Sequence, residues 1–135
     1  MVAGLQPLTA GQIAIDDGPL EPRATLMLSV MNGRREGNFV LAPEARLSDG
    51  HFDYVLAGRL SRWDILRLLP SLAGAGPPKE YPNVATGPCR RMTVKSLSPI
   101  AAHVDGEILS RPSHGRLTAT VELIPNRLRV AVIDE

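Results

Sequence analysis

Apolar and polar residues alternate along most of the chain, in short runs that Gly, Pro, Asp and Asn separate. Such alternation is typical of strands that bury one face. The short connections indicate antiparallel pairing, because parallel strands would need helical crossovers between them. We expect strands at 11–15, 23–32, 51–58, 90–98, 101–104, 107–110, 116–124 and 127–133. The pattern predicts a mainly β fold, either a sandwich or a barrel, and of these we predict an antiparallel β-sandwich.

The run at 23–32 is the strongest apolar stretch and predicts a buried strand. Thr25, Met27 and Val30 are residue types that suit the pleated core of a sheet. Asn32 closes this run.

One stretch, 61–76, has the spacing of a helix rather than of a strand. Ser61 can cap its start together with Asp64, and Gly74 or Gly76 can end it. Pro70 should shorten or kink it. We therefore predict a single substantial α-helix near residues 61–73, and an irregular loop over 74–83.

The apolar side of this helix has two interpretations. Its members are Trp63, Ile65, Leu66, Leu68 and Leu69. Helical spacing of apolar residues usually means packing against the core, and we favour that interpretation. The alternative is a patch that faces lipid.

Length and composition narrow the class of protein. With 135 residues, 44% of them hydrophobic and 21% charged, the chain is expected to form one globular domain over 1–135. A net charge of +1 offers no basic field, so we expect no nucleic-acid partner. Cys89 is the only cysteine, which excludes an internal disulfide and disfavours a zinc site. No membrane-spanning apolar run or charged-then-apolar leader is present in the sequence, and we expect a cytoplasmic location.

Asp-Gly pairs occur at 17–18, 49–50 and 105–106. The last pair stands between alternating apolar residues, which is a strong signal for a tight hairpin turn because Gly accepts positive φ. A turn explains Asp105 and Gly106, but it gives Glu107 no task. Taken alone, "DGE" indicates solvated acids of a surface turn.

The order of several motifs resembles a known family. Asn32 is followed by "GRREGNFVLAPEARLSDGHFDYVLAG", an amphipathic helix, a Pro-rich loop, a basic strand and finally "VDGE". This order resembles the C-terminal domain of the diacylglycerol kinase and sphingosine kinase superfamily, particularly the soluble bacterial lipid kinases, from about Gln12 to Val132. The segment "REGNF" has fewer glycines than the family's usual run after the Asn.

The resemblance implies a β-sandwich that closes over a lipid site, and a separate N-terminal domain with a "GGDGT" motif for nucleotide. That motif is absent from these 135 residues, and the stretch "LAGAGPP" is a poor phosphate cradle. We expect the nucleotide-binding domain of the same kinase to lie outside this chain. The chain alone is therefore expected to be inactive, with ATP bound mainly by the other domain.

The resemblance also assigns roles to named residues. Transfer of a phosphoryl group to a hydroxyl needs a carboxylate that takes the proton, and the matching residue is Glu107. Asp105, two residues earlier, is expected on the same face of a strand, where it supports an electrophile or caps the turn. Gly106 between them leaves room for substrate.

A second site is implied in "RLSDGHF". The family counterpart holds Mg²⁺ through one carboxylate and main-chain carbonyls, which map to Asp49 and to the carbonyls of Arg46 and His51. A plain Asp-Gly turn is the alternative. The arginine pairs 34–35 and 90–91 are either ligands for phosphate or anionic headgroups, or solvated strand ends, of which the second is the more common.

The expected function is the C-terminal half of an ATP-dependent lipid kinase that uses Mg²⁺ and a lipid acceptor. Peripheral membrane contact and a homodimer through exposed edge strands are further expectations. The alternative is a stand-alone, non-catalytic β-sandwich that binds a lipid or a protein partner. A glycosidase that uses Asp105 and Glu107 is disfavoured, because acids so close in sequence need not flank a sugar.

Overall fold

The computed structural model describes residues 9–127 of the chain. Within this range there are one α-helix, α1 (Arg62–Gly74), and one short 3-10 helix, η1 (Pro112–His114). The strands are β1 (Thr9–Ile15), β2 (Glu21–Thr25), β3 (Met27–Met31), β4 (Arg35–Glu36), β5 (Phe39–Val40), β6 (Phe52–Ala57), β7 (Val84–Cys89), β8 (Arg91–Ser96), β9 (Ala102–Val104), β10 (Glu107–Ser110) and β11 (Thr118–Glu122).

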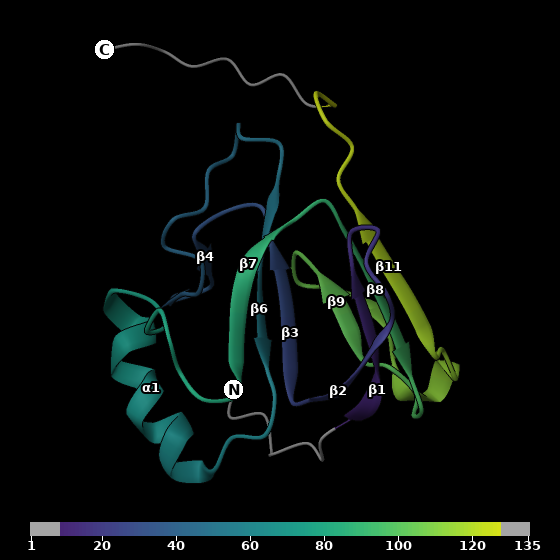
Figure 1. The fold of residues 1–135 in the computed structure, drawn as a ribbon, viewed down its shortest axis with the longest axis horizontal. Coiled ribbons are helices and arrows are strands. Elements are labelled where there is room, and N and C mark those ends of the chain that lie inside the picture. Colours follow the sequence, from purple (N-terminus) through teal and green to yellow (C-terminus); the bar gives the residue numbers. More distant parts are fainter. Residues whose placement is uncertain (1–8, 128–135) are drawn as a thin grey trace.

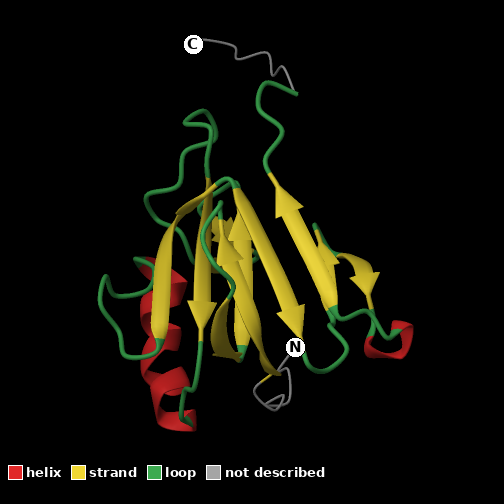
Figure 2. Ribbon diagram, turned by 45° about the vertical axis from the view of Figure 1, so that its right-hand side comes forward, coloured by secondary structure: helices red, strands yellow, loops and turns green. Residues whose placement is uncertain are grey.

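The strands form two main sheets. One sheet has the order β11-β8-β1-β2 and the other the order β3-β6-β7, while β9–β10 and β4–β5 are small separate hairpins. Every strand pairing among the described residues is antiparallel. In Figure 1 the three-stranded sheet lies between α1 on the left and the four-stranded sheet on the right, and Figure 2 shows these layers from a second side. The predicted antiparallel β-sandwich with one substantial helix is confirmed.

Strand β6 is the middle strand of the three-stranded sheet and is apolar on both faces. Val55 contributes to a buried cluster on the α1 side, with Met31, Leu41, Ala42 and Ala45. The next residue, Leu56, contributes to a cluster between the sheets, with Ile13, Cys89 and Met92. Because successive strand residues point to opposite faces, one strand supports both layers of core.

The single cysteine has a structural role in this core. Cys89 is completely buried, and its neighbour in the cluster, Met92, is nearly so. Burial is the main reason that the pKa of the Cys89 thiol rises to about 11, with smaller contributions from the charges of Asp16 and Asp53. The thiol stays protonated at neutral pH and behaves as a small apolar group.

Helix α1 begins as the sequence predicts. Ser61 Oγ accepts a hydrogen bond from the Asp64 amide at 3.2 Å, and Asp64 Oδ2 accepts one from the Ser61 amide at 2.8 Å. This is a complete capping box. The Tyr81 hydroxyl also donates to Asp64 Oδ1 at 2.9 Å. The hydrogen bonds from Ser61, followed by that from Tyr81, lower the pKa of Asp64.

Pro70 does not shorten the helix, because α1 continues to Gly74. A kink at Pro70, the other expected effect, stays a prediction. A proline inside a helix has no N–H to donate to the carbonyl four residues earlier, which is that of Leu66. Both Pro70 and Leu66 are exposed. The loss of this hydrogen bond therefore falls on the outer side of the helix, where water can replace it.

The apolar stretch at 23–32 is not one buried strand. It breaks at Leu26 into β2, which pairs with β1, and β3, which pairs with β6. The Leu26 amide donates to the Ala57 carbonyl at 2.8 Å where the chain passes from one sheet to the other. Met27 is 40% exposed, so the prediction of a uniformly buried strand is wrong. Alternation of residue types gives no signal for this change of partner.

Strand β7 was not predicted, because Gly87 and Pro88 interrupt its pattern. It lies at the edge of its sheet, where a proline is tolerated since one side of the strand needs no amide donor. The two-residue strands β4 and β5 were too short to predict. The expected strand at 127–133 lies outside the described residues except for Arg127.

The turn after β1 is fastened to the start of β8 by Asp16. Its Oδ1 accepts hydrogen bonds from the amides of Arg90 at 2.6 Å and Arg91 at 3.0 Å. The Asp16 amide donates to the Arg91 carbonyl at 2.8 Å. The two amides that donate to the carboxylate are the main cause of a lowered pKa for Asp16.

We expect Asp16→Asn to reduce stability at neutral pH and to flatten its pH dependence. Because the folded-state pKa of Asp16 lies below its unfolded value, the ionised carboxylate stabilises the fold above the unfolded pKa. This contribution is lost as the pH falls through the folded-state pKa. Asn tolerates the positive φ of 53° at this position, so the change removes mainly the charge.

Urea unfolding of the two proteins between about pH 7 and about pH 3 measures this effect. Asp17→Asn is the control, because the Asp17 side chain is 98% exposed and receives none of the amide hydrogen bonds of Asp16. An Asp16→Asn protein that loses stability in acid as steeply as the wild type would contradict the prediction.

Gly11 of β1 lies against the main chain of β8. A Cβ atom at this position would overlap the main-chain carbonyl oxygen of Lys95. Gly11→Ala should therefore force the strands apart and lower the free energy of unfolding by about 1–3 kcal/mol. Gly33→Ala is the matched control, because a Cβ there has no neighbour within 4 Å. Equal urea midpoints for the two variants would show that β1 and β8 can adjust without cost.

Candidate functional site

The "VDGE" motif forms the tip of the β9–β10 hairpin. Asp105 and Gly106 have φ values of 48° and 84°, and positive φ at both central residues is the signature of a type I′ turn. The predicted hairpin is confirmed. Asp105 is therefore a turn residue and not a strand residue, so the expected same-face arrangement of Asp105 and Glu107 along one strand does not apply.

Glu107 is the first residue of β10 and is exposed. Its partner across the hairpin is Val104, while Ile108 pairs with His103. Because paired residues project to the same side, Glu107 and Val104 share one face of the hairpin and His103 and Ile108 share the other. Val104 is 53% exposed and Leu109 is 57% exposed. The Glu107 carboxylate thus lies on a surface with exposed apolar side chains nearby.

The other face of this hairpin approaches strand β4, which follows Asn32. His103 Nε2 lies 3.9 Å from Glu36 Oε1. Ser29 of β3 donates a hydrogen bond to Glu36 Oε2 at 2.7 Å. Two segments of the family-like pattern that are distant in sequence are therefore in contact.

Neither Glu36 nor His103 was singled out from the sequence. Glu36 lies in "RREGN", where the sequence pointed to the arginine pair and the few glycines but not to the acid, and His103 is a lone histidine in an alternating strand. No spacing rule connects them, because their contact depends on how β4 and β9 are placed. The only signal was the shared occurrence of both segments in the family-like order.

Asp49, Arg46 and His51 lie in the loop before β6. The His51 amide donates to Asp49 Oδ1 at 3.1 Å, and Gly50 has a φ of 74°. This is the geometry of an Asx-type turn. Within residues 9–127, no hydrogen bond is assigned to Asp49 Oδ2, and no group of three or more His, Cys, Asp or Glu side chains is placed to hold a metal. A site made of one carboxylate and two carbonyls stays a prediction.

The charge of Asp49 affects the pKa of a neighbouring carboxyl group. Burial is the main cause that raises the pKa of Asp53 in β6, and the negative charges of Asp49 and Glu44 raise it further. Three carboxylates therefore belong to one electrostatic neighbourhood. Among residues 9–127, no hydrogen bond or salt bridge joins this loop to Glu107 or Asp105.

The arginine pairs differ in what their side chains do. Arg91 forms salt bridges with Glu122 at 2.6 Å and Asp17 at 3.5 Å, which supports a structural role. Arg34 and Arg35 reach main-chain carbonyls only at 3.5 Å.

Arg91 also borders a groove of about 380 Å³, lined by Asp16, Asp17, Gly50, Arg90, Arg91, Glu122, Leu123 and Pro125. In this groove the positive charge of Arg91 is already paired with the carboxylates of Asp17 and Glu122.

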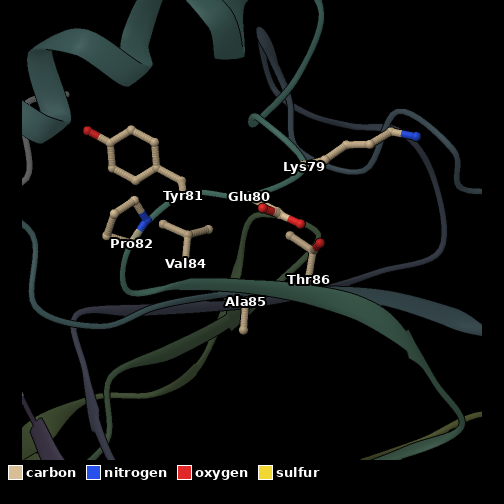
Figure 3. Close-up of a pocket in the computed structure, with 7 residues that line it drawn as sticks. All are labelled: Lys79, Glu80, Tyr81, Pro82, Val84, Ala85 and Thr86. Atoms are coloured by element: carbon tan, nitrogen blue, oxygen red, sulfur yellow. The ribbon is translucent and has the colours of Figure 1, made fainter.

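A second, more open groove of about 610 Å³ runs beside the edge strand β7. Lys79, Glu80, Tyr81, Pro82, Val84, Ala85 and Thr86 line it. In Figure 3 the side chains of Val84 and Thr86 point to one side of β7 and that of Ala85 to the other, while the Tyr81 ring points toward α1. Neither groove is lined by Glu107 or Asp49.

Between residues 9 and 127, no helix has both the length and the hydrophobicity that crossing a bilayer requires.

The fold is similar to that of several solved structures. A crystal structure described as a candidate diacylglycerol kinase from Bacillus anthracis Sterne aligns over 92% of this chain and 40% of its own, with a TM-score of 0.69 and 14% identity. Another structure, of a diacylglycerol kinase from the same organism, aligns over 93% of this chain and 46% of its own, with a TM-score of 0.57 and 13% identity. At such identities the likeness establishes the fold alone.

Sequence comparison gives relatives with the same name. Diacylglycerol kinases of two strains of Staphylococcus epidermidis are each 25% identical to this chain over 96 residues. The aligned part covers 71% of this chain but 30% of each relative. The chain thus corresponds to less than half the length of the kinases that it matches.

A match to a family model shows which protein family this chain belongs to. The model of the YegS C-terminal NAD kinase beta sandwich-like domain matches residues 1–132, nearly the whole chain. The match includes the two-sheet framework, the loop with Asp49 and the hairpin with Glu107. This chain belongs to the family of YegS C-terminal NAD kinase beta sandwich-like domains.

Proposed function

We propose that this chain is the lipid-acceptor domain of an ATP-dependent lipid kinase of the diacylglycerol kinase type. The observation that supports this most directly is the position of Glu107. An exposed carboxylate follows a type I′ turn at the start of a strand, and exposed apolar side chains lie on the same hairpin. A lipid hydroxyl needs both a proton acceptor and an apolar surface.

The reaction assigns one step to Glu107. The lipid hydroxyl oxygen forms a bond with the γ-phosphorus of ATP while the bond from that phosphorus to the β-phosphate oxygen breaks, which releases ADP. Glu107 accepts the proton of the hydroxyl. Asp105 and Gly106 hold the turn that presents this carboxylate. On the opposite face of the hairpin, His103 lies near Glu36 of the β4–β5 hairpin.

The nucleotide requires a second domain. Of the two grooves described above, the more enclosed one already pairs Arg91 with two carboxylates. We therefore assign ATP binding to a nucleotide-binding domain that the longer relatives have room for. The lipid acceptor belongs to the class of lipids with a free hydroxyl beside acyl chains.

The loop with Asp49 fits a Mg²⁺ ion by its donor chemistry. Mg²⁺ prefers oxygen ligands and keeps several waters, so one carboxylate with the carbonyls of Arg46 and His51 is a suitable set. The Asx-type turn holds one carboxylate oxygen and leaves the other without an assigned hydrogen bond among the described residues. A bound Mg²⁺ would supply positive charge to a loop in which Asp49, Asp53 and Glu44 interact.

The proposal is tested by Glu107→Gln in an enzyme that joins this domain to its nucleotide-binding domain. Gln keeps the shape and a hydrogen-bonding group but cannot take the proton. We expect kcat to fall by about 10²- to 10⁴-fold, which corresponds to about 3–5 kcal/mol of barrier. The KM for ATP and the melting temperature should change little, because Glu107 is exposed and belongs to the acceptor side.

Asp105→Asn is the matched control, since Asn supports the same turn without the charge. It should cost much less in kcat than Glu107→Gln. Kinase activity of the Glu107→Gln enzyme within a few-fold of wild type would leave the turn as the whole explanation of "VDGE".

The Mg²⁺ site is tested by Asp49→Ala and Asp49→Asn in parallel. Addition of Mg²⁺ should raise the melting temperature of the wild-type chain, because an ion that binds only the folded state stabilises it. Both variants should need at least about tenfold more Mg²⁺ for the same rise, since both lack the only carboxylate ligand.

The Asn variant separates the metal from the turn, because Asn can still accept the His51 amide hydrogen bond. Loss of the Mg²⁺ response in Asp49→Ala but not in Asp49→Asn would identify Asp49 as a turn residue only. A Mg²⁺ response that both variants retain would place the ion elsewhere.

A further inference from the structure

The apolar residues of α1 lie on both sides of the helix, and the largest of them, Trp63, faces outward. Leu68 is buried, and Leu72 packs against the cluster that contains Val55. On the opposite side Trp63 is 73% exposed, Leu66 is 56% exposed and Leu69 is 39% exposed. The expectation that Trp63 and Leu66 pack in the core is therefore wrong.

These residues form one continuous surface. Trp63, Leu66 and Pro70 follow the i, i+3, i+7 spacing of a helix face, and Leu69 and Ala73 extend the same face. All five are exposed. We call Trp63, Leu66, Leu69, Pro70 and Ala73 the outer face of α1. Figure 1 shows that α1 lies at the border of the molecule, on the side away from the four-stranded sheet.

Positive charge borders this face. Arg62 and Arg67 are exposed on the helix, and Arg59 is exposed just before it. In the part of the chain that the structure describes, none of these arginines forms a salt bridge. The only acid between residues 59 and 76 is Asp64, which is occupied by the helix cap and by Tyr81.

We propose that the outer face of α1 binds the surface of an anionic phospholipid bilayer. A helix with Trp and Leu on one face and Arg at its margins lies in the plane of a membrane interface. There the apolar side chains enter the acyl boundary, the indole stays near the headgroups, and the long Arg side chains reach the phosphates. The proposal stands apart from the kinase function, because no residue assigned to phosphoryl transfer belongs to this face.

A second copy of the chain fits the same face less well. A symmetric dimer through α1 would bring Arg59, Arg62 and Arg67 of both copies to one interface, with a single engaged Asp64 from each. An anionic lipid surface instead offers phosphates to all of them. Each basic residue near such a surface favours binding, so the charge pattern selects lipid over self-association.

Trp63 makes the test direct, because it is the only tryptophan in the sequence. The full 135-residue chain is titrated with vesicles of phosphatidylcholine containing phosphatidylglycerol, and in parallel with vesicles of phosphatidylcholine alone. We expect the Trp63 emission to shift to the blue and to resist acrylamide quenching with the anionic vesicles. The effect should be much weaker with the neutral vesicles and should decline with added salt.

Two variants locate the surface. Leu66→Glu should weaken partition into anionic vesicles about tenfold or more, because it replaces an inserted apolar side chain with an acid. Leu97→Glu is its control, since Leu97 is 83% exposed and lies outside α1.

Arg62→Gln with Arg67→Gln should weaken partition about tenfold on anionic vesicles only. Arg111→Gln with Arg116→Gln is the matched control for charge, because both of these arginines are exposed.

Circular dichroism and melting temperatures confirm that each variant is folded. An unchanged Trp63 emission with anionic vesicles would overturn the proposal, as would equal weakening by Leu66→Glu and Leu97→Glu. Equal binding to neutral and anionic vesicles would overturn its electrostatic part.

If sedimentation shows a dimer that Leu66→Glu abolishes, the occupant is a second copy. If a nucleotide-binding domain added in trans shifts the emission without vesicles, the occupant is that domain. None of these measurements uses ATP or turnover, so their failure leaves the kinase proposal intact.

Discussion

Strand β6 has to be apolar on both faces, and the other layers of the molecule depend on that. Val55 faces the cluster on the α1 side and Leu56 faces the cluster between the sheets. A strand of this kind leaves two apolar surfaces exposed until both are covered. The four-stranded sheet covers one and α1 with the 41–45 loop covers the other. The helix is thus needed by the sheet, although Leu68 is the only buried residue of α1.

The candidate site lies on segments that add little to this core. The β9–β10 hairpin forms its own small sheet, and most of its residues are exposed. At one side His103 lies 3.9 Å from Glu36, and both side chains are exposed. A catalytic carboxylate on such a hairpin can face a second domain without disturbing the packing of the first. This arrangement suits a site that two domains complete together.

The sequence predicted the features that depend on local chemistry. The capping box of Ser61 and Asp64 and the turn at Asp105 and Gly106 both formed as expected, because each is decided by residues within a few positions. The prediction of antiparallel strands rested instead on the short connections between strands, which leave no room for helical crossovers. Sequence-based prediction failed for features that depend on contacts between residues far apart in the sequence. The change of sheet at Leu26, the edge strand that contains Pro88 and the contact of Glu36 with His103 depend on tertiary placement, which alternation of residue types does not encode.

The outer face of α1 was misjudged for a different physical reason. Helical spacing shows that apolar residues gather on a helix, but the side that faces the core depends on which residues meet the sheet. In α1 Leu68 is buried, Leu72 packs against the cluster that contains Val55, and the capping acid Asp64 accepts a hydrogen bond from Tyr81. Rotation of the helix to bury Trp63 would move Leu68 into solvent and break the hydrogen bond to Tyr81. The large apolar side chains are therefore held outside by the contacts that fix the helix, and they are available to a surface other than the core of this domain.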